Sequence, residues 1–161
     1  MSLHLRILRH GEAAPARTSD AERPLTARGL AEARQMGAWL ATQPHPPSRI
    51  LVSPLRRAQE TAAAVQASLP DTQLATVDWL VPETRPLVAL AELESLTGSV
   101  LLVTHQPFAG ALAGLLAHGD IARAEPMVTA GLAELAVEMA VPGMARLVRI
   151  TTPASLADSD I

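Results

Sequence analysis

The chain has no cysteine and few aromatic residues, and these two absences exclude several kinds of function. Without cysteine there are no disulfides, no thiolate metal sites and no cysteine nucleophile. Aromatic residues make up 2% of the sequence, so the core must be built from aliphatic side chains. The scarcity of aromatic rings also argues against nucleic-acid binding by base stacking.

The sequence also lacks an excess of positive charge. The formal net charge is −3 and the isoelectric point is near 5.9, which leaves no basic surface for a polyanion. We therefore expect no nucleic-acid partner. Any phosphate site must be a local cluster of Arg and His, and the substrate must be small or present one phosphate at a time.

Long hydrophobic runs are absent as well. No apolar segment approaches the roughly 18 uninterrupted residues of a membrane-spanning helix. The N-terminal segment breaks its apolar run with His4 and Arg6 and has no cleavage-site pattern, so we expect no signal peptide. These features predict a cytoplasmic protein with no membrane partner.

The length and composition are typical of one compact domain. The chain has 161 residues, of which 48% are hydrophobic and 18% charged. We predict a single domain over residues 1–153, followed by a C-terminal tail, residues 154–161, with the composition of a loose end.

Predicted strands and helices alternate along the chain. Strands are expected at residues 3–8, 50–52, 74–77 and 100–103, and helices near residues 26–42, from 53–54, after 86 and directly after 105. Segments 131–141 and 146–151 flank Pro142-Gly143, which predicts an antiparallel hairpin. The pattern predicts an α/β three-layer sandwich with a mostly parallel central sheet, an antiparallel edge hairpin and helices on both faces.

Helical spacing of apolar residues predicts which faces pack on the sheet. In the helix near 26–42 the expected stripe is Leu30, Ala33, Gly37 and Leu40. In the helix after residue 86 it is Leu87, Leu90 and Ala91.

Polar residues suited to phosphate follow three of the predicted strands. These are Arg9-His10, the segment 53–57 with Arg56 and Arg57, and His105. Ligands of open α/β sheets bind at the carboxyl ends of the strands, so these side chains should converge. Taken singly, each histidine could instead hydrogen-bond a carbonyl structurally, and the arginine pair could be a solvated helix face. Positive charge near a helix N-terminus opposes the helix dipole, however, and a bound anion would explain it.

The same segments resemble the signatures of a known family. Arg9-His10-Gly11 resembles the RHG signature of the histidine phosphatase superfamily. Residues 53–61 are similar to its S-x-x-x-R-A-x-x-T segment, and Thr104-His105 to its second-histidine motif. The compact size and residues 19–29 most resemble the SixA-like phosphohistidine phosphatases. The order and spacing agree over nearly the whole chain.

The resemblance assigns roles to individual residues. It implies that His10 attacks phosphorus and becomes phosphohistidine, that Arg9 and Arg57 hold the equatorial oxygens, and that His105 donates to the same oxygens. Arg23 matches an arginine of the compact subgroup that reaches the phosphate. Because phosphoryl transfer requires mainly positioning and charge stabilisation, arginines can supply the positive field, and we expect neither a metal nor another cofactor.

In the motif S-x-x-x-R the arginine is four residues past Ser53, which selects Arg57. Consecutive helical residues point about 100° apart, so Arg56 is expected to face solvent. His4 and His45 are likewise expected at the surface.

A general acid is the missing part of the pattern. Many relatives that cleave phosphate esters carry a carboxylic acid in a mid-chain loop, and no segment here matches it. Glu83 is the nearest candidate and Asp78 a weaker one, although Glu83 is better explained as a carboxylate at a helix start. An acid matters less when the leaving group is an imidazole, which favours a phosphohistidine substrate on a protein.

Two alternatives remain open on the sequence. One is a phosphatase for a small phosphate ester in the same fold, which an acid at Glu83 would favour. The other is a catalytically silent phosphate-binding module, against which the presence of His10, Arg57 and His105 argues.

Overall fold

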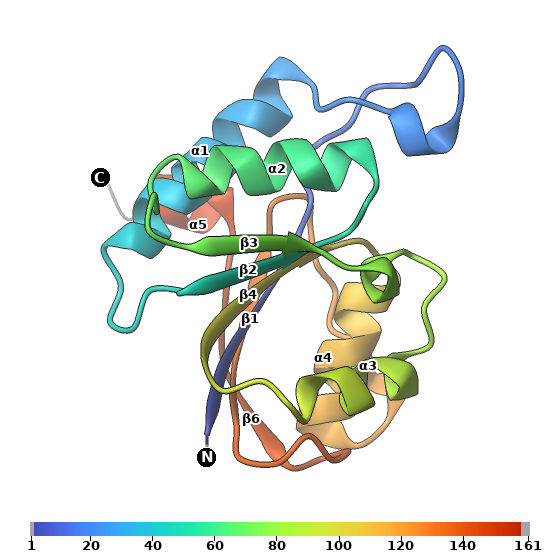
Figure 1. The fold of residues 1–161 in the computed structure, drawn as a ribbon, viewed down its shortest axis with the longest axis vertical. Coiled ribbons are helices and arrows are strands. Elements are labelled where there is room, and N and C mark those ends of the chain that lie inside the picture. Colours follow the sequence, from blue (N-terminus) through green and yellow to red (C-terminus); the bar gives the residue numbers. More distant parts are fainter. Residues whose placement is uncertain (1, 159–161) are drawn as a thin grey trace.

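A six-stranded mixed sheet forms the centre of the computed structural model, which describes residues 2–158 (Figure 1). The strand order is β3-β2-β4-β1-β5-β6, with β3, β2, β4 and β1 parallel and β5 antiparallel to both of its neighbours. The strands are β1 (Leu3–Arg9), β2 (Arg49–Val52), β3 (Gln73–Thr76), β4 (Gly98–Thr104), β5 (Leu132–Val137) and β6 (Ala145–Thr151). This arrangement confirms the predicted α/β sandwich, including its antiparallel edge.

Helices cover both faces of the sheet (Figure 1). One face carries α1 (Ala27–Ala41), α2 (Arg56–Gln66) and the short α5 (Pro153–Asp158), and the other carries α3 (Pro86–Leu93) and α4 (Phe108–His118). Short 3₁₀ turns are η1 (Asp20–Glu22), η2 (Asp78–Leu80) and η3 (Ile121–Arg123). Within residues 2–158, no helix is long and apolar enough to cross a membrane.

Alternation along β1 builds two aliphatic cores. Leu5 and Ile7 pack in the core beneath α3 and α4, whereas Leu8 packs in the core beneath α1 and α2. All three side chains are fully buried. Burying an aliphatic side chain of this size contributes about 2 kcal/mol, so the sheet is stabilised from both faces.

Helix α1 begins and packs much as the sequence predicts. The Thr26 hydroxyl caps it by accepting from the Gly29 amide. At Gly37 the helix approaches α2 so closely that a Cβ would lie 2.8 Å from the Cα of Val65. Met36 rather than Leu30 completes the buried stripe, because Leu30 lies at its edge and is only half-buried.

The prediction of which face of α3 is buried is wrong. Leu87 is 60% exposed, and the buried residues are Ala89, Leu90 and Leu93. Apolar residues occupy nearly every position of this helix, so periodicity in the sequence could not select the buried face. Packing against α4 selects it instead.

The C-terminal segment is more ordered than the predicted loose end. Residues 153–158 form α5, and residues 159–161 lie outside the described part of the chain. Thr152 and Ser155 cap the helix reciprocally, since each backbone amide donates to the other's hydroxyl oxygen. Leu156 then packs against the core beneath α1 and α2, which anchors the helix.

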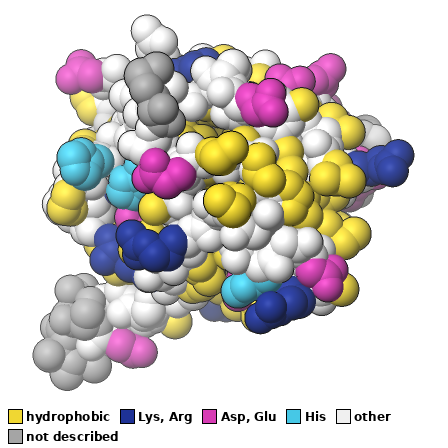
Figure 2. All heavy atoms as spheres, turned by 90° about the horizontal axis from the view of Figure 1, so that it is seen from below, with side chains coloured by type: hydrophobic (Ala, Val, Ile, Leu, Met, Phe, Trp, Pro, Cys, Tyr) yellow, Lys and Arg dark blue, Asp and Glu magenta, His cyan; other side chains and the backbone are white. Residues whose placement is uncertain are grey.

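One end of the molecule exposes apolar side chains. Seen from below, hydrophobic side chains gather in a patch flanked by charged residues (Figure 2). The β5–β6 connection exposes Met139, Val141 and Met144, and α3 exposes Leu87 and Val88. Large apolar patches are uncommon on monomers and often mark surfaces of association.

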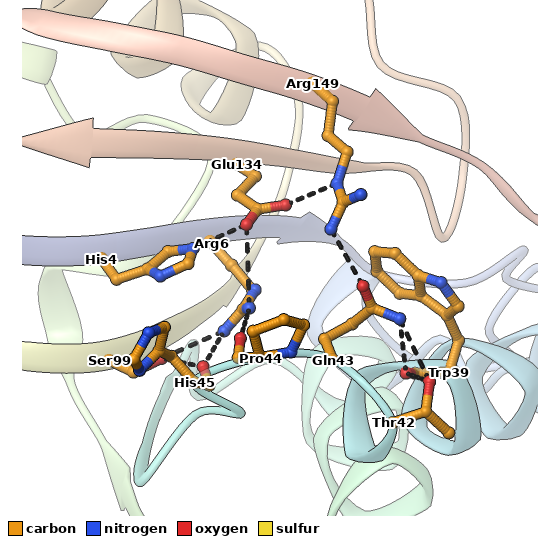
Figure 3. Close-up of polar contacts among 10 residues, drawn as sticks. All are labelled: His4, Arg6, Trp39, Thr42, Gln43, Pro44, His45, Ser99, Glu134 and Arg149. Carbon is orange, nitrogen blue, oxygen red and sulfur yellow. Dashed lines mark hydrogen bonds and ion pairs between the residues drawn. The ribbon is translucent and has the colours of Figure 1, made fainter.

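Arg6 is the largest fully buried polar side chain among the described residues. Its Nη1 donates to the carbonyl oxygen of His45 (2.7 Å) and to Ser99 Oγ (3.0 Å), and its Nη2 donates to the carbonyl oxygen of Pro44 (3.1 Å). Glu134 supplies the counter-charge, with its Oε1 3.7 Å from Arg6 Nη2 (Figure 3).

Glu134 is itself held by two further cationic or polar groups. His4 Nε2 lies 2.6 Å from Oε1, and Arg149 Nε donates to Oε2 at 2.8 Å (Figure 3). Burial alone would raise the pKa of Glu134, but the hydrogen bonds from Arg149 and His4 outweigh it and the net shift is downward. His4 is therefore a half-buried member of this network and not a free surface residue, while His45 is exposed as expected.

We expect Glu134→Gln to lower the free energy of unfolding by about 3 kcal/mol, because it leaves the buried Arg6 guanidinium without a counter-charge. Urea denaturation followed by circular dichroism measures the change. Glu138→Gln, at an exposed acid just beyond β5, is the control and should change stability little. Equal stability of the Glu134→Gln variant and the wild type would contradict a structural role for the pair.

Candidate active site

Parallel strand pairing brings the three predicted segments together. Strands β1 and β4 pair in a register that places Arg9 beside Thr104, and the His10 amide donates to the Thr104 carbonyl at 2.9 Å. The His10 and His105 rings therefore lie 5.0 Å apart between centroids, with an angle of 56° between their planes. On the other side of β4, the Ser53 amide donates to the Val103 carbonyl at 3.1 Å.

His10 is buried and its tautomer is fixed. Its Nδ1 lies 2.7 Å from the carbonyl oxygen of Gly11, which can only accept, so Nδ1 carries the proton. Nε2 is then left with its lone pair. Burial lowers the pKa of His10 to about 4, aided by Arg57 and Arg9 and opposed by the bond to Gly11. The ring is neutral at neutral pH, as a nitrogen nucleophile must be.

Hydrogen bonds to residues of α2 hold the loop that follows His10. The Gly11 amide donates to Thr61 Oγ1 (3.0 Å), and the Thr61 hydroxyl donates to the Arg57 carbonyl (2.7 Å). A Cβ at position 11 would lie 2.6 Å from the carbonyl oxygen of Gly29, so only glycine fits here. The carbonyl that fixes the His10 tautomer is thus itself rigidly placed.

His105 is the second buried imidazole. Burial lowers its pKa to about 3, and the neighbouring His10 and Arg57 add to the effect. Its Nε2 lies 2.7 Å from Ser53 Oγ, which already accepts from the Leu55 amide at 3.2 Å. Either the serine hydroxyl or the ring nitrogen can donate in this bond; with the serine as donor, the single ring proton of neutral His105 is on Nδ1.

The two adjacent arginines point in different directions. Arg57 has a side chain only 5% exposed, whereas Arg56 is 50% exposed and lies 3.6 Å from Glu60. Helix α2 begins at Arg56, two residues later than predicted, because Pro54 and Leu55 are extended or bent and Leu55 is the N-cap. The expected separation of the two side chains is nevertheless found.

Arg9 and Arg23 both lie near His10 and are held by main-chain carbonyl groups. Arg9 Nη1 donates to the carbonyl oxygen of Met127 at 2.9 Å, and burial lowers its pKa. Arg23 Nε donates to the carbonyl oxygen of Ala14 at 3.2 Å. The positive charges of Arg57, Arg9 and Arg23 all lower the pKa of His10, so all three guanidiniums face its surroundings.

Most of the buried donors without a partner belong to this cluster. Among the described residues, four buried side-chain nitrogen atoms have no hydrogen-bond partner, and three of them are Arg9 Nε, Arg57 Nε and His105 Nδ1. The two guanidinium nitrogens are donors, and so is His105 Nδ1 when the ring proton is there, so the group they fit is an anion with several acceptor oxygens. The same positive field disfavours a metal cation.

The structure does not join Glu83 to this cluster. Glu83 is exposed in the turn that the hydrogen bond from the Thr84 amide to the Val81 carbonyl closes. Its side chain makes no hydrogen bond or ion pair within residues 2–158. It also precedes the first turn of α3, which begins at Pro86. Asp78 is likewise exposed, at the start of η2.

Three contributors were not identified from the sequence. Ser53 and Thr61 are fixed polar positions of the segment 53–61, so their place in the motif was an available signal. Asp20 carries no such signal, yet its carboxylate lies 3.2 Å from Arg57 Nη2 and 3.4 Å from Arg23 Nη1.

The fold and site together define a class of protein: an α/β protein with a cluster of cationic side chains around a neutral, buried histidine. Residues 5–80 match the family described as Histidine phosphatase superfamily (branch 1). The chain is also 38% identical, over 122 residues, to phosphohistidine phosphatase SixA of Escherichia coli (strain K12), and the match covers 71% of this chain and 74% of the relative. The chain belongs to the histidine phosphatase superfamily.

Solved structures agree with this assignment. The protein histidine phosphatase SixA complexed with tungstate superposes with a TM-score of 0.87 at 30% identity, covering 97% of this chain and 99% of that one. A mycobacterial glucosyl-3-phosphoglycerate phosphatase, at 18% identity, shares the fold with a TM-score of 0.68, covering 94% and 98% of the two chains. The fold is thus common to proteins whose names give different substrates.

We expect the ring of His10 to titrate near pH 4, and not near the ordinary value of about 6.5, because burial penalises the imidazolium. Since the unfolded chain binds protons below about pH 6.5 and the folded ring does not, stability should also fall as the pH drops from there towards 4. A pH titration by NMR, with the resonance assigned through His10→Ala, measures the pKa. A midpoint at the ordinary value would contradict the buried neutral ring.

We expect Arg57→Ala to weaken binding of inorganic phosphate roughly a hundredfold, about 3 kcal/mol, because it removes a charge-assisted, forked contact. Arg57→Lys should recover only part, since a point charge lacks the fork. Arg56→Ala is the matched control and should bind phosphate as the wild type does. Isothermal titration calorimetry measures all four proteins, and a larger loss at Arg56 would show that the pocket is built differently.

Proposed function

We propose that this protein removes phosphate from phosphohistidine on a protein, with His10 as the nucleophile and a phosphohistidine intermediate on its ring. The observation that carries the proposal is the bond from His10 Nδ1 to the Gly11 carbonyl, which leaves Nε2 unprotonated among unpartnered donors. The printed name of the relative from Escherichia coli, phosphohistidine phosphatase SixA, supports the same substrate class.

In the first step, the Nε2 lone pair of His10 forms a bond to phosphorus. The bond between phosphorus and the substrate's ring nitrogen breaks, and its electron pair stays on that nitrogen. A phosphohistidine with a proton on its second ring nitrogen leaves as a neutral imidazole. No protein acid is then required, which agrees with the absence of any contact between Glu83 and the site.

Charge on the transferring phosphoryl group is stabilised by fixed donors. Arg9 and Arg57 bind the equatorial oxygens, His105 donates from Nδ1, and Arg23 adds positive charge nearby. In a water-poor pocket each such donor contributes about 3 kcal/mol to the transition state. Because protein contacts already hold these groups in place, little reorganisation is required during the reaction.

In the second step, water attacks the phosphorus of phosphorylated His10. A new bond between oxygen and phosphorus forms and the bond from phosphorus to Nε2 breaks. The electron pair returns to Nε2, and both protons of the water leave with inorganic phosphate. His10 regains the neutral form with its proton on Nδ1, ready for another cycle.

We expect a higher kcat/KM, by at least about a hundredfold, for a phosphohistidine-bearing protein than for a panel of phosphate monoesters, because an alkoxide needs an acid that an imidazole does not. Both substrates are assayed with one enzyme preparation. Glu83→Gln should leave both rates unchanged. Faster ester cleavage that Glu83→Gln abolishes would favour the alternative, a phosphatase for a small phosphate ester.

We also expect His10→Ala to lose turnover, and acid-labile, base-stable label from a radioactive substrate to appear on the wild-type peptide that contains His10. His118→Asn, at a histidine in the last turn of α4, is the control and should retain activity. If the His10→Ala variant turned over substrate as fast as the wild type, the assignment of the nucleophile would be overturned. A wild-type protein that binds phosphate but has no phosphatase activity would favour the alternative of a phosphate-binding module.

A further inference from the structure

The Asp20 carboxylate lies where the proposed phosphate ligands converge. Its Oδ2 is 3.2 Å from Arg57 Nη2, and its Oδ1 is 3.4 Å from Arg23 Nη1. The negative charge of Asp20 also reaches His105, where it acts to raise a pKa that burial lowers. One carboxylate therefore interacts with three of the groups proposed to bind the phosphoryl group.

The contacts of Arg57 divide its guanidinium into two edges. Nη1 donates to the main-chain carbonyl oxygen of Asp20 at 2.9 Å, which anchors the outer edge. Nε and Nη2 form the other edge, a parallel fork suited to two oxygens of one anion. Nε has no partner, and Nη2 is held by the Asp20 carboxylate. Nη2 has a second N–H, so an oxyanion on this fork lies directly beside the Asp20 carboxylate and is opposed by its negative charge.

The Asp20 side chain is easily displaced. It is 67% exposed, whereas the Arg57 side chain is only 5% exposed. Rotation of the carboxylate into solvent exposes the fork without disturbing the bond from Nη1 to the Asp20 carbonyl. Because the carboxylate is largely solvated, a phosphate dianion held by several donors can replace it.

We propose that Asp20 is an internal anion that competes with substrate phosphate for Arg57 and Arg23, and thereby sets the affinity of the site. The proposal rests on the phosphate site of the proposed function. The main chain of Asp20 positions Arg57 in both states, and only its side chain exchanges with phosphate. Removing the carboxylate should therefore tighten phosphate binding and leave the chemistry of the bound state nearly unchanged.

Isothermal titration calorimetry with inorganic phosphate tests the competition in the wild type, Asp20→Asn and Asp20→Ala. Both variants should bind phosphate about fivefold more tightly. With a phosphohistidine protein as substrate, KM should fall while kcat stays within about twofold. Glu22→Gln is the matched control, because it removes an exposed negative charge from the same turn, and its phosphate affinity should stay close to that of the wild type.

The outcomes separate this inference from the proposed function. Unchanged or weaker phosphate binding by both Asp20 variants would overturn the competition. A fall in kcat without tighter binding would also overturn it and would make Asp20 a positioning residue for Arg57. An equal gain in Glu22→Gln would show a general charge effect and not competition for the fork. Failure of every protein to bind phosphate would instead overturn the anion site itself.

Discussion

The parallel pairing of β1 with β4 is the constraint on which the site depends. Because the two strands end in register, His10 and His105 lie side by side at one edge of the sheet. Helices cover both faces, so both rings are buried and neither is protonated at neutral pH. The proposed nucleophile is thus prepared by the sheet: strand register sets its place, and burial sets its protonation state.

The buried polar groups around Arg6 and those around His10 differ in how far their hydrogen bonds are satisfied. Around Arg6, carbonyl oxygens, Ser99 and Glu134 satisfy the two terminal nitrogens of a fully buried guanidinium (Figure 3). Around His10, several buried donors have no partner at all. Leaving such donors unpaired costs stability, and the cost is recovered when an anion binds. The first cluster serves the fold, and the second is the site proposed to bind phosphate.

The exposed η1 turn bears on the affinity of the proposed site for phosphate. A pocket of unopposed guanidiniums would bind product phosphate as well as substrate, and product release often limits turnover. A carboxylate such as that of Asp20 reduces this affinity without removing a phosphate ligand. The same turn therefore both anchors Arg57 through its main chain and weakens anion binding through its side chain.

The sequence by itself predicted the order of strands and helices, and it selected His10 and His105 because each directly follows a short apolar strand and strand ends meet at one edge. The resemblance to the family motif selected Arg57 over Arg56. It could not orient α3, since that helix is apolar on nearly every side and only packing against α4 chooses a face. Nor could it identify Asp20, whose partners Arg57 and Arg23 come from different segments and meet only when the loop folds over α2. Local patterns fix what each segment is, whereas contacts between distant segments decide which charges face one another.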